Sequence, residues 1–376
     1  MLLGFGALVA WASEERPQAA RGVLGFSYNH DEVADVPWSI HVLKIDRTRT
    51  DLEFHTTLGR GGSFGLTTLS EQLKSLPPAL GQPLGAINGD FWRDGHQPAG
   101  DPMGLQIRQG ELVSGPCERS CFWIDAQGQP QATNVLAQFA VIWPDGQSTL
   151  FGVNEERPNR GAVLFTAAVG ASTKTRGGRE VVLERAGDNS WFPLRVGESY
   201  TARVREVREA GDAPLTADIA VLSLSPELAA RLPRPALGAS LKLAMETIPS
   251  LRGVQTAIGG GPMLVRDGKA ATFSEPKREP RTAIGWNDKQ FFFVVVDGRQ
   301  NKLSVGMSFP ELAAYFVKLG CQRAMNLDGG GSATFWVRGQ VMNSPCYGHE
   351  RPMANALILM QKPKSPGASR PDSPGQ

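Results

Sequence analysis

Two aspartates each end an apolar run and are each followed by glycine. Asp297 ends the run in "FFFVVVDGRQ" (residues 291–300), and Asp328 ends "RAMNLD" (residues 323–328). Two carboxylates on one cleft wall can divide into an acid and a base or nucleophile, as glycoside hydrolysis requires. They can instead coordinate a hard divalent cation, or each can cap its own turn through backbone N–H groups. All three roles are open from these residues alone.

Glycine runs are the second feature with chemical potential. Two of them precede strand-like segments and contain Gly329, Gly330, Gly331 and Ser332 in one case and Gly260 and Gly261 in the other. Successive backbone N–H groups without side chains can hold an anionic oxygen. The run is not a P-loop, because no Lys-Ser/Thr pair follows the last glycine. We therefore expect close approach of a ligand to bare backbone.

Arginines and an amide stand at further strand ends. Arg281 precedes the apolar segment "TAIGW", and Arg351 precedes "PMANALILM". A guanidinium stays charged and matches a phosphate or carboxylate in two hydrogen bonds, although a surface ion pair is the default for a single arginine. Asn88 and Asp90 lie in "NGDFW" (residues 88–92), where two aromatic side chains are suited to stacking on a sugar ring.

The elements that must position these residues are predicted by pattern. Residues 291–297 are an apolar strand, and a helix starts at Ser308, whose side chain forms a capping box with Glu311. Residues 323–328 form the next strand. One crossover helix makes the two strands parallel, so that Asp297 and Asp328 project from the same edge of the sheet into one cleft.

Composition narrows the class of protein. The 376-residue chain has 39 basic and 37 acidic side chains, a net charge of +2, and no basic block, so a nucleic-acid partner is not indicated. An apolar run at the N-terminus ends in Ala10-Trp11-Ala12, as in a secretory signal, and is too short to span a membrane. We expect an exported protein, periplasmic or secreted. Four cysteines favour two disulfides, Cys117–Cys121 and Cys321–Cys346.

The pattern along the chain predicts an α+β fold with strand-rich mixed sheets and a βαβ crossover near the C-terminus. We assign residues 1–20 to a signal-peptide remnant, residues 21–361 to a single catalytic domain and residues 362–376 to a disordered tail. Within the domain, residues 135–250 alternate short strands with turns and form a variable substrate region. The oligomeric state is not predicted.

The ordered motifs resemble the phosphodiester glycosidase family. They are "NGDFW", "GGGPMLVRDGK", "PRTAIGW", "VVVDGRQ", "GMSFPELAAYFVKLGC", "NLDGGGSATFWV" and "GHERPMANAL". The resemblance covers residues 37–361. "NGDFW" departs from the family, which commonly has glycine and phenylalanine where Asp90 and Trp92 stand. Bacterial members are exported proteins associated with exopolysaccharide. The resemblance implies hydrolysis of the bond between an anomeric carbon and a phosphodiester oxygen, without a required cofactor.

The resemblance also implies roles for single residues. Asp328 and Asp297 suit the anomeric centre, Asn88 and Asp90 suit sugar hydroxyls, and Glu350 and His349 are reserve acids. The phosphate is assigned to the bare-backbone glycines and to Arg281 and Arg351, and Ser332 and Arg299 are further substrate-binding candidates. Two alternatives stay open: a glycan-binding protein without turnover, and a phosphodiesterase that holds Ca²⁺ or Mg²⁺ on Asp90, Asp297 and Asp328.

Overall fold

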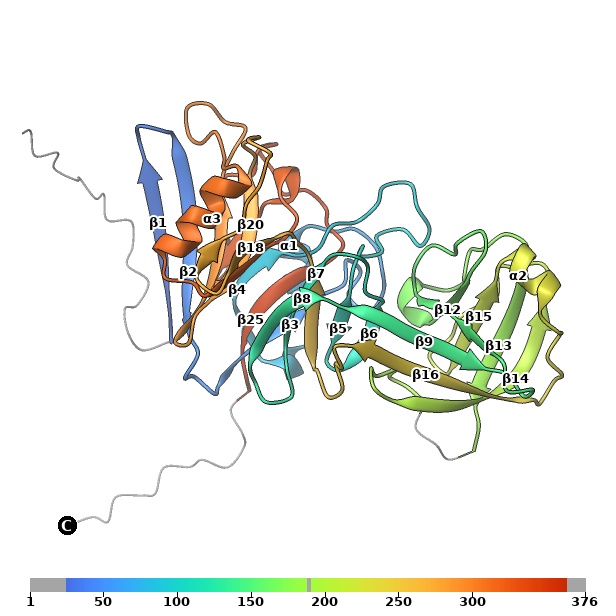
Figure 1. Ribbon diagram of the computed structural model, residues 1–376. Helices are drawn as coiled ribbons and strands as arrows, with labels where there is room; N and C mark the ends of the chain where they lie inside the picture. Colours follow the sequence, from blue (N-terminus) through green and yellow to red (C-terminus); the bar gives the residue numbers. More distant parts are fainter. Residues whose placement is uncertain (1–24, 188–190, 364–376) are drawn as a thin grey trace, which may run out of the picture.

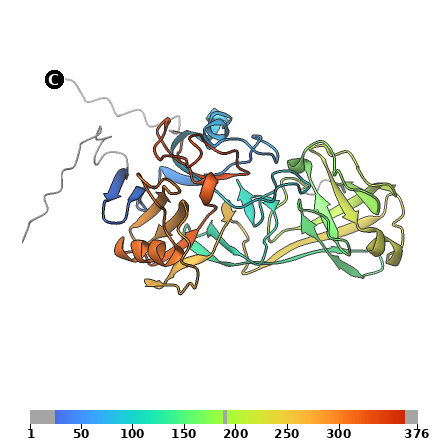
Figure 2. The same ribbon diagram turned by 90° about the horizontal axis from the view of Figure 1, so that it is seen from above.

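The computed structural model describes residues 25–187 and 191–363, so the predicted signal remnant and most of the predicted tail lie outside the described residues. Four β-sheets make up most of this part of the chain. The eight-stranded sheet lies at one end of the molecule, and the seven-stranded sheet, covered by one helix, lies at the other (Figure 1). The view from above shows the same elongated arrangement (Figure 2).

The seven-stranded sheet combines the two ends of the chain. In spatial order its strands are β1 (Phe26–Val33), β2 (Trp38–Asp46), β21 (Gln290–Val296), β20 (Arg281–Trp286), β22 (Arg323–Asn326), β18 (Met263–Arg266) and β19 (Lys269–Ala270). The predicted hairpin turn of Asp267 and Gly268 joins β18 to β19, with φ values of 49° and 73°. Helix α3 (Phe309–Lys318) begins at the predicted capping box of Ser308 and Glu311.

Two five-stranded sheets form the middle of the molecule. One runs β24 (Gln340–Val341), β23 (Phe335–Val337), β4 (Gln82–Asn88), β25 (Ala356–Gln361) and β3 (Leu52–Thr56). The other runs β6 (Glu111–Ser114), β5 (Gln106–Arg108), β17 (Thr256–Gly259), β7 (Ser120–Ile124) and β8 (Pro130–Asn134). Leu43, Ile87 and Phe122 come from three different sheets and share one buried cluster, so these sheets pack around a common core.

All strands of the eight-stranded sheet lie within residues 136–248. Its order is β10 (Ser148–Leu150), β9 (Leu136–Ile142), β16 (Ser240–Ile248), β14 (Ser199–Arg208), β13 (Arg179–Arg185), β15 (Ile219–Leu224), β12 (Ala162–Phe165) and β11 (Gly152–Val153). Strands β9 and β16 extend from the middle of the molecule into this lobe (Figure 1). The short helical elements elsewhere are α1 (Leu69–Lys74), α2 (Pro226–Arg231), η1 (Pro78–Leu80), η2 (Ala167–Val169) and η3 (Gly330–Ser332).

The expectation of an α+β fold is wrong, because the described residues are mainly β. They contain three α-helices, of 6, 6 and 10 residues, against 25 strands. The strand–helix–strand segment exists, but it does not set the architecture. Strand β20 lies between β21 and β22 and pairs antiparallel with both, so β21 and β22 are parallel without being neighbours. One helix packed on one sheet face is too little helix to make a second layer.

No helix in the described residues is both long and apolar enough to cross a membrane. All four cysteines are free thiols, so neither predicted disulfide is formed in this structure. Cys321 is buried with α3 in the core of the seven-stranded sheet, whereas Cys346 lies beside Gly330. That separation accounts for the missing second bond.

Two acidic side chains lie close to each other, Asp101 in the loop after β4 and Glu155 after a strand of the eight-stranded sheet. Asp101 is 7% exposed and Glu155 follows β11. Burial raises the pKa of Asp101 to about 6. Burial, and then the charge of Asp101, raise the pKa of Glu155 to about 7. Arg93 opposes both shifts. The two carboxyls therefore bind protons more tightly in the folded than in the unfolded chain.

Folding stability is expected to fall as the pH rises from about 4 through about 7, since both raised pKa values mean that the folded state resists ionisation. For Asp101 the loss is on the order of 2–3 kcal/mol. Asp101→Asn should flatten this part of the pH dependence, measured by urea unfolding across the range. The exposed Asp35→Asn variant serves as control and should follow the wild type. Identical curves for Asp101→Asn and the wild type would contradict the assignment.

Candidate active site

Asp328 lies immediately beyond β22 and is held through its backbone. Its N–H donates to the carbonyl of Gly89 at 2.9 Å, and its carbonyl accepts from Asn88 Nδ2 at 2.6 Å. Its carboxylate accepts from the Gly329 N–H at 2.9 Å. Burial raises the pKa of this carboxyl, and the Ser332 hydroxyl and nearby Arg351 oppose the rise. A partly buried carboxylate at a strand end, with a raised pKa, is suited to proton or nucleophile chemistry.

Asp90 is the carboxylate close to Asp328. It is 1% exposed and accepts hydrogen bonds from the N–H groups of Phe91 and Gly104, both at 2.8 Å. Burial raises the pKa of Asp90 to about 6; the charge of Arg119 lowers it and that of Asp328 raises it. Asp90 is thus a buried carboxyl close to Asp328, closed off from solvent.

Asn88 connects the two segments. Its Nδ2 holds the carbonyl of Asp328, and its Oδ1 accepts from Thr282 Oγ1 at 2.6 Å and from the Thr334 N–H at 3.1 Å. The side chain is fully buried. Its polar groups are therefore committed to the protein, so the structure gives Asn88 a supporting place and not the sugar contact that the sequence suggested.

Arg351 is the arginine best placed for a ligand. Its Nη1 is 3.5 Å from Ser332 Oγ, its guanidinium lies 4.4 Å from the Trp92 ring centre, and Nη2 is 3.7 Å from Asp94 Oδ2. The Arg351 side chain is 35% exposed and that of Asp94 is 77% exposed. An exposed pair of this kind contributes little to stability, so an anion can replace Asp94 at small cost.

Arg119 is a site residue that sequence reasoning missed. Its Nε donates to the carbonyl of Gly260 at 3.1 Å, Nη2 lies 3.4 Å from the Gly261 oxygen, and the guanidinium lies 3.9 Å from the Phe91 ring centre. Its charge lowers the pKa of both Asp90 and Asp328. No strand-end pattern marks it. The sequence feature that could have drawn attention to Arg119 is its place between two cysteines, in "CERSC".

The other predicted residues lie in other surroundings. Asp297 is 1% exposed and both of its oxygens are engaged: Oδ2 by Ser39 and His41, and Oδ1 by Asn343 and Ser344. The predicted pairing of Asp297 with Asp328 is therefore replaced by Asp90 with Asp328.

Arg281 is also internal. It is 9% exposed, donates to the carbonyls of Met307 and Lys277, and lies 4.0 Å from the Phe309 ring centre. These contacts use the guanidinium for packing around the start of α3, and not for a ligand.

Three further candidates lie around the site's edge. Arg299 pairs with Glu279 at 2.6 Å and lies over Gly330. Glu350 accepts from the N–H of Ser70 at 3.0 Å, at the first turn of α1. The His349 ring is 6.4 Å from that of Tyr347. Glu350 therefore has a structural partner.

The glycine run is explained by the protein's own packing. The N–H groups of Gly329 and Gly330 are bound to Asp328 Oδ1 and to the carbonyl of Pro280. A Cβ on Gly329 would lie 2.6 Å from the Pro280 oxygen, and one on Gly331 would lie 2.3 Å from Tyr347 Cε2. The expected nest of free N–H groups is not formed, because internal acceptors and neighbouring chain take its place.

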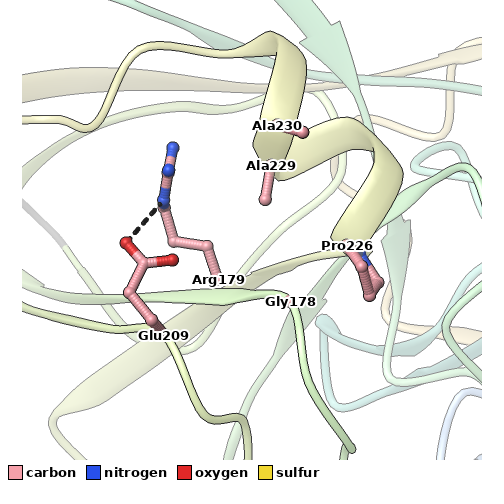
Figure 3. A pocket seen from close by; sticks show the side chains of 6 residues that line it. All are labelled: Gly178, Arg179, Glu209, Pro226, Ala229 and Ala230. Atoms are coloured by element: carbon pink, nitrogen blue, oxygen red, sulfur yellow. Dashed lines mark hydrogen bonds and ion pairs between the residues drawn. The ribbon is translucent and has the colours of Figure 1, made fainter.

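Among the described residues, no group of three His, Cys, Asp or Glu side chains is placed to hold a metal ion. Asp90, Asp297 and Asp328 accordingly form no such ligand set. Two cavities, of about 290 and 280 Å³, are lined by residues that do not include Asp328. Figure 3 shows one of them, where Arg179 pairs with Glu209 beside α2 in the eight-stranded lobe.

The model of one family fits residues 217–360. It is the phosphodiester glycosidase family. The resemblance predicted from the motifs is thus confirmed over the part of the chain that carries Asp328 and Arg351. The match does not extend to Asp90 or Arg119, which lie N-terminal to it.

Two curated proteins are similar to part of this chain. The SPbeta prophage-derived uncharacterized protein YomE of Bacillus subtilis is 31% identical over 115 residues, 29% of this chain and 18% of its own length. The N-acetylglucosamine-1-phosphodiester alpha-N-acetylglucosaminidase of Bos taurus is 32% identical over 107 residues, 25% of this chain and 20% of its own length. The aligned part spans about a fifth of each of these relatives.

Solved structures share the fold over most of the chain. A hypothetical protein from Synechocystis has a TM-score of 0.71 at 18% identity, over 89% of this chain and 62% of its own. An exported protein, so described, from Burkholderia pseudomallei K96243 has a TM-score of 0.64 at 20% identity, over 86% and 74%. The sheets described above therefore recur in other proteins.

Gly259→Ala is expected to destabilise the protein by about 1–3 kcal/mol through overpacking. A Cβ there would lie 2.3 Å from Asp90 Oδ2 and 3.0 Å from Gly104 Cα, both in the buried floor of the site. Gly62→Ala is the matched control, because no atom lies within 4 Å of its Cβ. Urea unfolding of both variants measures the difference, and equal stability for the two would refute the packing around Asp90.

Proposed function

We propose that this protein hydrolyses a glycosyl phosphodiester, the bond between a sugar's anomeric carbon and a phosphodiester oxygen. One observation carries the proposal: the partly buried Asp328 carboxylate and the partly exposed Arg351 guanidinium both lie against Ser332, with Asp90 and Arg119 close to Asp328. The match of residues 217–360 to the phosphodiester glycosidase family supports the same reaction.

The chemistry suits this set of side chains. As the anomeric C–O bond breaks, its electron pair goes to the phosphate oxygen, which leaves as a phosphomonoester. Its second pKa is near 6, so the leaving group needs little help from a general acid. Arg351 neutralises the charge that develops on the phosphate. A water oxygen finally joins the anomeric carbon, and its proton is taken up by a carboxylate or by solvent.

Asp328 is assigned to the anomeric centre, either as the nucleophile or as the base for water. A carboxylate in either place stabilises the oxocarbenium-like transition state. Asp90 is too buried to touch the sugar. The charge of Asp328 raises the pKa of Asp90, and Arg119 lowers the pKa of both carboxyls. Trp92 and Tyr347, the latter 56% exposed, offer ring faces to a sugar.

The proposed setting is outside the cytoplasm. The N-terminal apolar run, outside the described residues, and the description of the Burkholderia relative as exported support this proposal. The substrate is then a sugar phosphodiester of a cell-surface or extracellular glycan, such as an exopolysaccharide. The bovine relative's name supports N-acetylglucosamine 1-phosphodiesters as the first compounds to try.

Asp328→Asn is expected to lower the turnover of a sugar 1-phosphodiester by at least about 100-fold, since it removes a catalytic carboxylate. The assay is release of free sugar from a panel of α- and β-linked methyl phosphodiesters of N-acetylglucosamine, glucose and mannose. Asp267→Asn, an exposed acid in the hairpin after β18, should keep wild-type rates.

Sugar binding by both forms with turnover by neither would favour a glycan-binding protein and rule out the hydrolase. Full activity of Asp328→Asn would remove Asp328 from the chemistry.

A further inference from the structure

A segment of chain covers the short helix that follows Asp328. We call residues 343–351 the strap; it leads from β24 toward β25. Tyr347 packs on Gly331, and Cys346 Sγ is 4.0 Å from the Gly330 oxygen. Arg351, the strap's last residue, contacts Ser332. The place of Arg351 and Tyr347 in the site therefore depends on how the strap is held.

The C-terminal end of the strap is fastened to the segment around α1. Glu350 Oε1 accepts from the Ser70 N–H at 3.0 Å. Three residues further on, Met353 exchanges backbone hydrogen bonds of 2.8 and 3.3 Å with Thr67. These contacts fix the position of the chain just before and after Arg351.

The N-terminal end of the strap is fastened to Asp297. Asp297 Oδ1 accepts from Asn343 Nδ2 at 3.1 Å and from the Ser344 N–H at 2.9 Å. Gln300 adds two bonds to Ser344, one to its carbonyl at 2.8 Å and one from its hydroxyl at 2.9 Å. A carboxylate that accepts from backbone and side-chain donors gives stronger hydrogen bonds than a neutral group would.

The other oxygen of Asp297 faces a buried polar group. Oδ2 accepts from Ser39 Oγ at 2.8 Å and lies 3.0 Å from His41 Nε2, and His41 Nδ1 is 2.8 Å from the Tyr28 hydroxyl. Asp297 and His41 are 1% and 2% exposed. With four donors on two oxygens and no access to solvent, the carboxylate is satisfied inside the protein and cannot reach a substrate.

We propose that Asp297 is a positioning residue that anchors the strap, so that Arg351 and Tyr347 keep their places beside Asp328. The β2 strand, through Ser39 and His41, fixes the carboxylate from one side, and the strap binds it from the other. The consequence for turnover rests on the proposed function, whereas the anchoring itself does not.

Cys346 makes the anchoring measurable without a substrate. In the reduced protein, the rate of Cys346 alkylation by iodoacetamide, followed by mass spectrometry, reports opening of the strap. Asp297→Asn should speed it by roughly tenfold or more, because a strap that loses its charged anchor opens more often. Cys117, also partly buried and outside the strap, is the reference within the same molecule and should keep its rate.

Two variants accompany the test. Tyr28→Phe removes a hydroxyl from the far side of His41 and should leave the Cys346 rate unchanged. Asn343→Ala replaces Asp297→Asn if the latter does not fold: it removes one donor to Asp297, together with the Asn343 bonds to Phe335 and Ala333, and should also raise the Cys346 rate. With a sugar 1-phosphodiester that the wild type cleaves, Asp297→Asn should lower kcat/KM together with the rise in the Cys346 rate, because Arg351 and Tyr347 lose their places.

The outcomes separate the two proposals. A wild type that cleaves no glycosyl phosphodiester sinks the proposed function and leaves the alkylation result standing. An Asp297→Asn protein that folds, loses kcat and keeps the wild-type Cys346 rate overturns the positioning role, and would place Asp297 in the chemistry.

Discussion

The backbone contact between Asp328 and the end of β4 is the constraint on which the site depends. It joins two sheets: Asp328 follows β22 of the seven-stranded sheet, and Asn88 is the last residue of β4 of a five-stranded one, with Gly89 next to it. Since Asn88 is fully buried and its amide is bound on both sides, the two strand ends cannot slide past each other. That contact brings Asp90 near Asp328 and fixes the chain that leads to Arg351's partner Ser332.

The surroundings of this contact also explain the glycines. Asp90 needs room in the interior, and Gly104 and Gly259 give it because neither has a Cβ. Gly329 and Gly331 give the same room to Pro280 and Tyr347. Bare backbone here lets segments of the protein approach one another closely, and the carboxylates are set by that packing. This packing buries the Asp90 carboxyl, and the burial raises its pKa.

Local signals in the sequence were sufficient for local structure. The capping box at Ser308, the hairpin turn at Asp267 and the apolar run of β21 each follow from a few neighbouring residues. The contact of Asp328 with Asn88 does not follow from neighbouring residues, because Asn88 belongs to a strand in another sheet, about 240 residues earlier in the chain. The strand-end argument placed Asp297 and Asp328 on one edge, but could not show that β20 separates their strands. Arg119 lies in a loop whose only visible pattern was its cysteines.

The most direct test of the account is a crystal structure with a sugar 1-phosphate bound, for example N-acetylglucosamine 1-phosphate. The account predicts the anomeric carbon within about 3–4 Å of an Asp328 carboxylate oxygen, close to the distance at which reacting atoms meet. It predicts the phosphate on the Arg351 guanidinium, in place of Asp94. A ligand bound elsewhere with Asp328 untouched, for instance in the cavity beside Arg179, would contradict it.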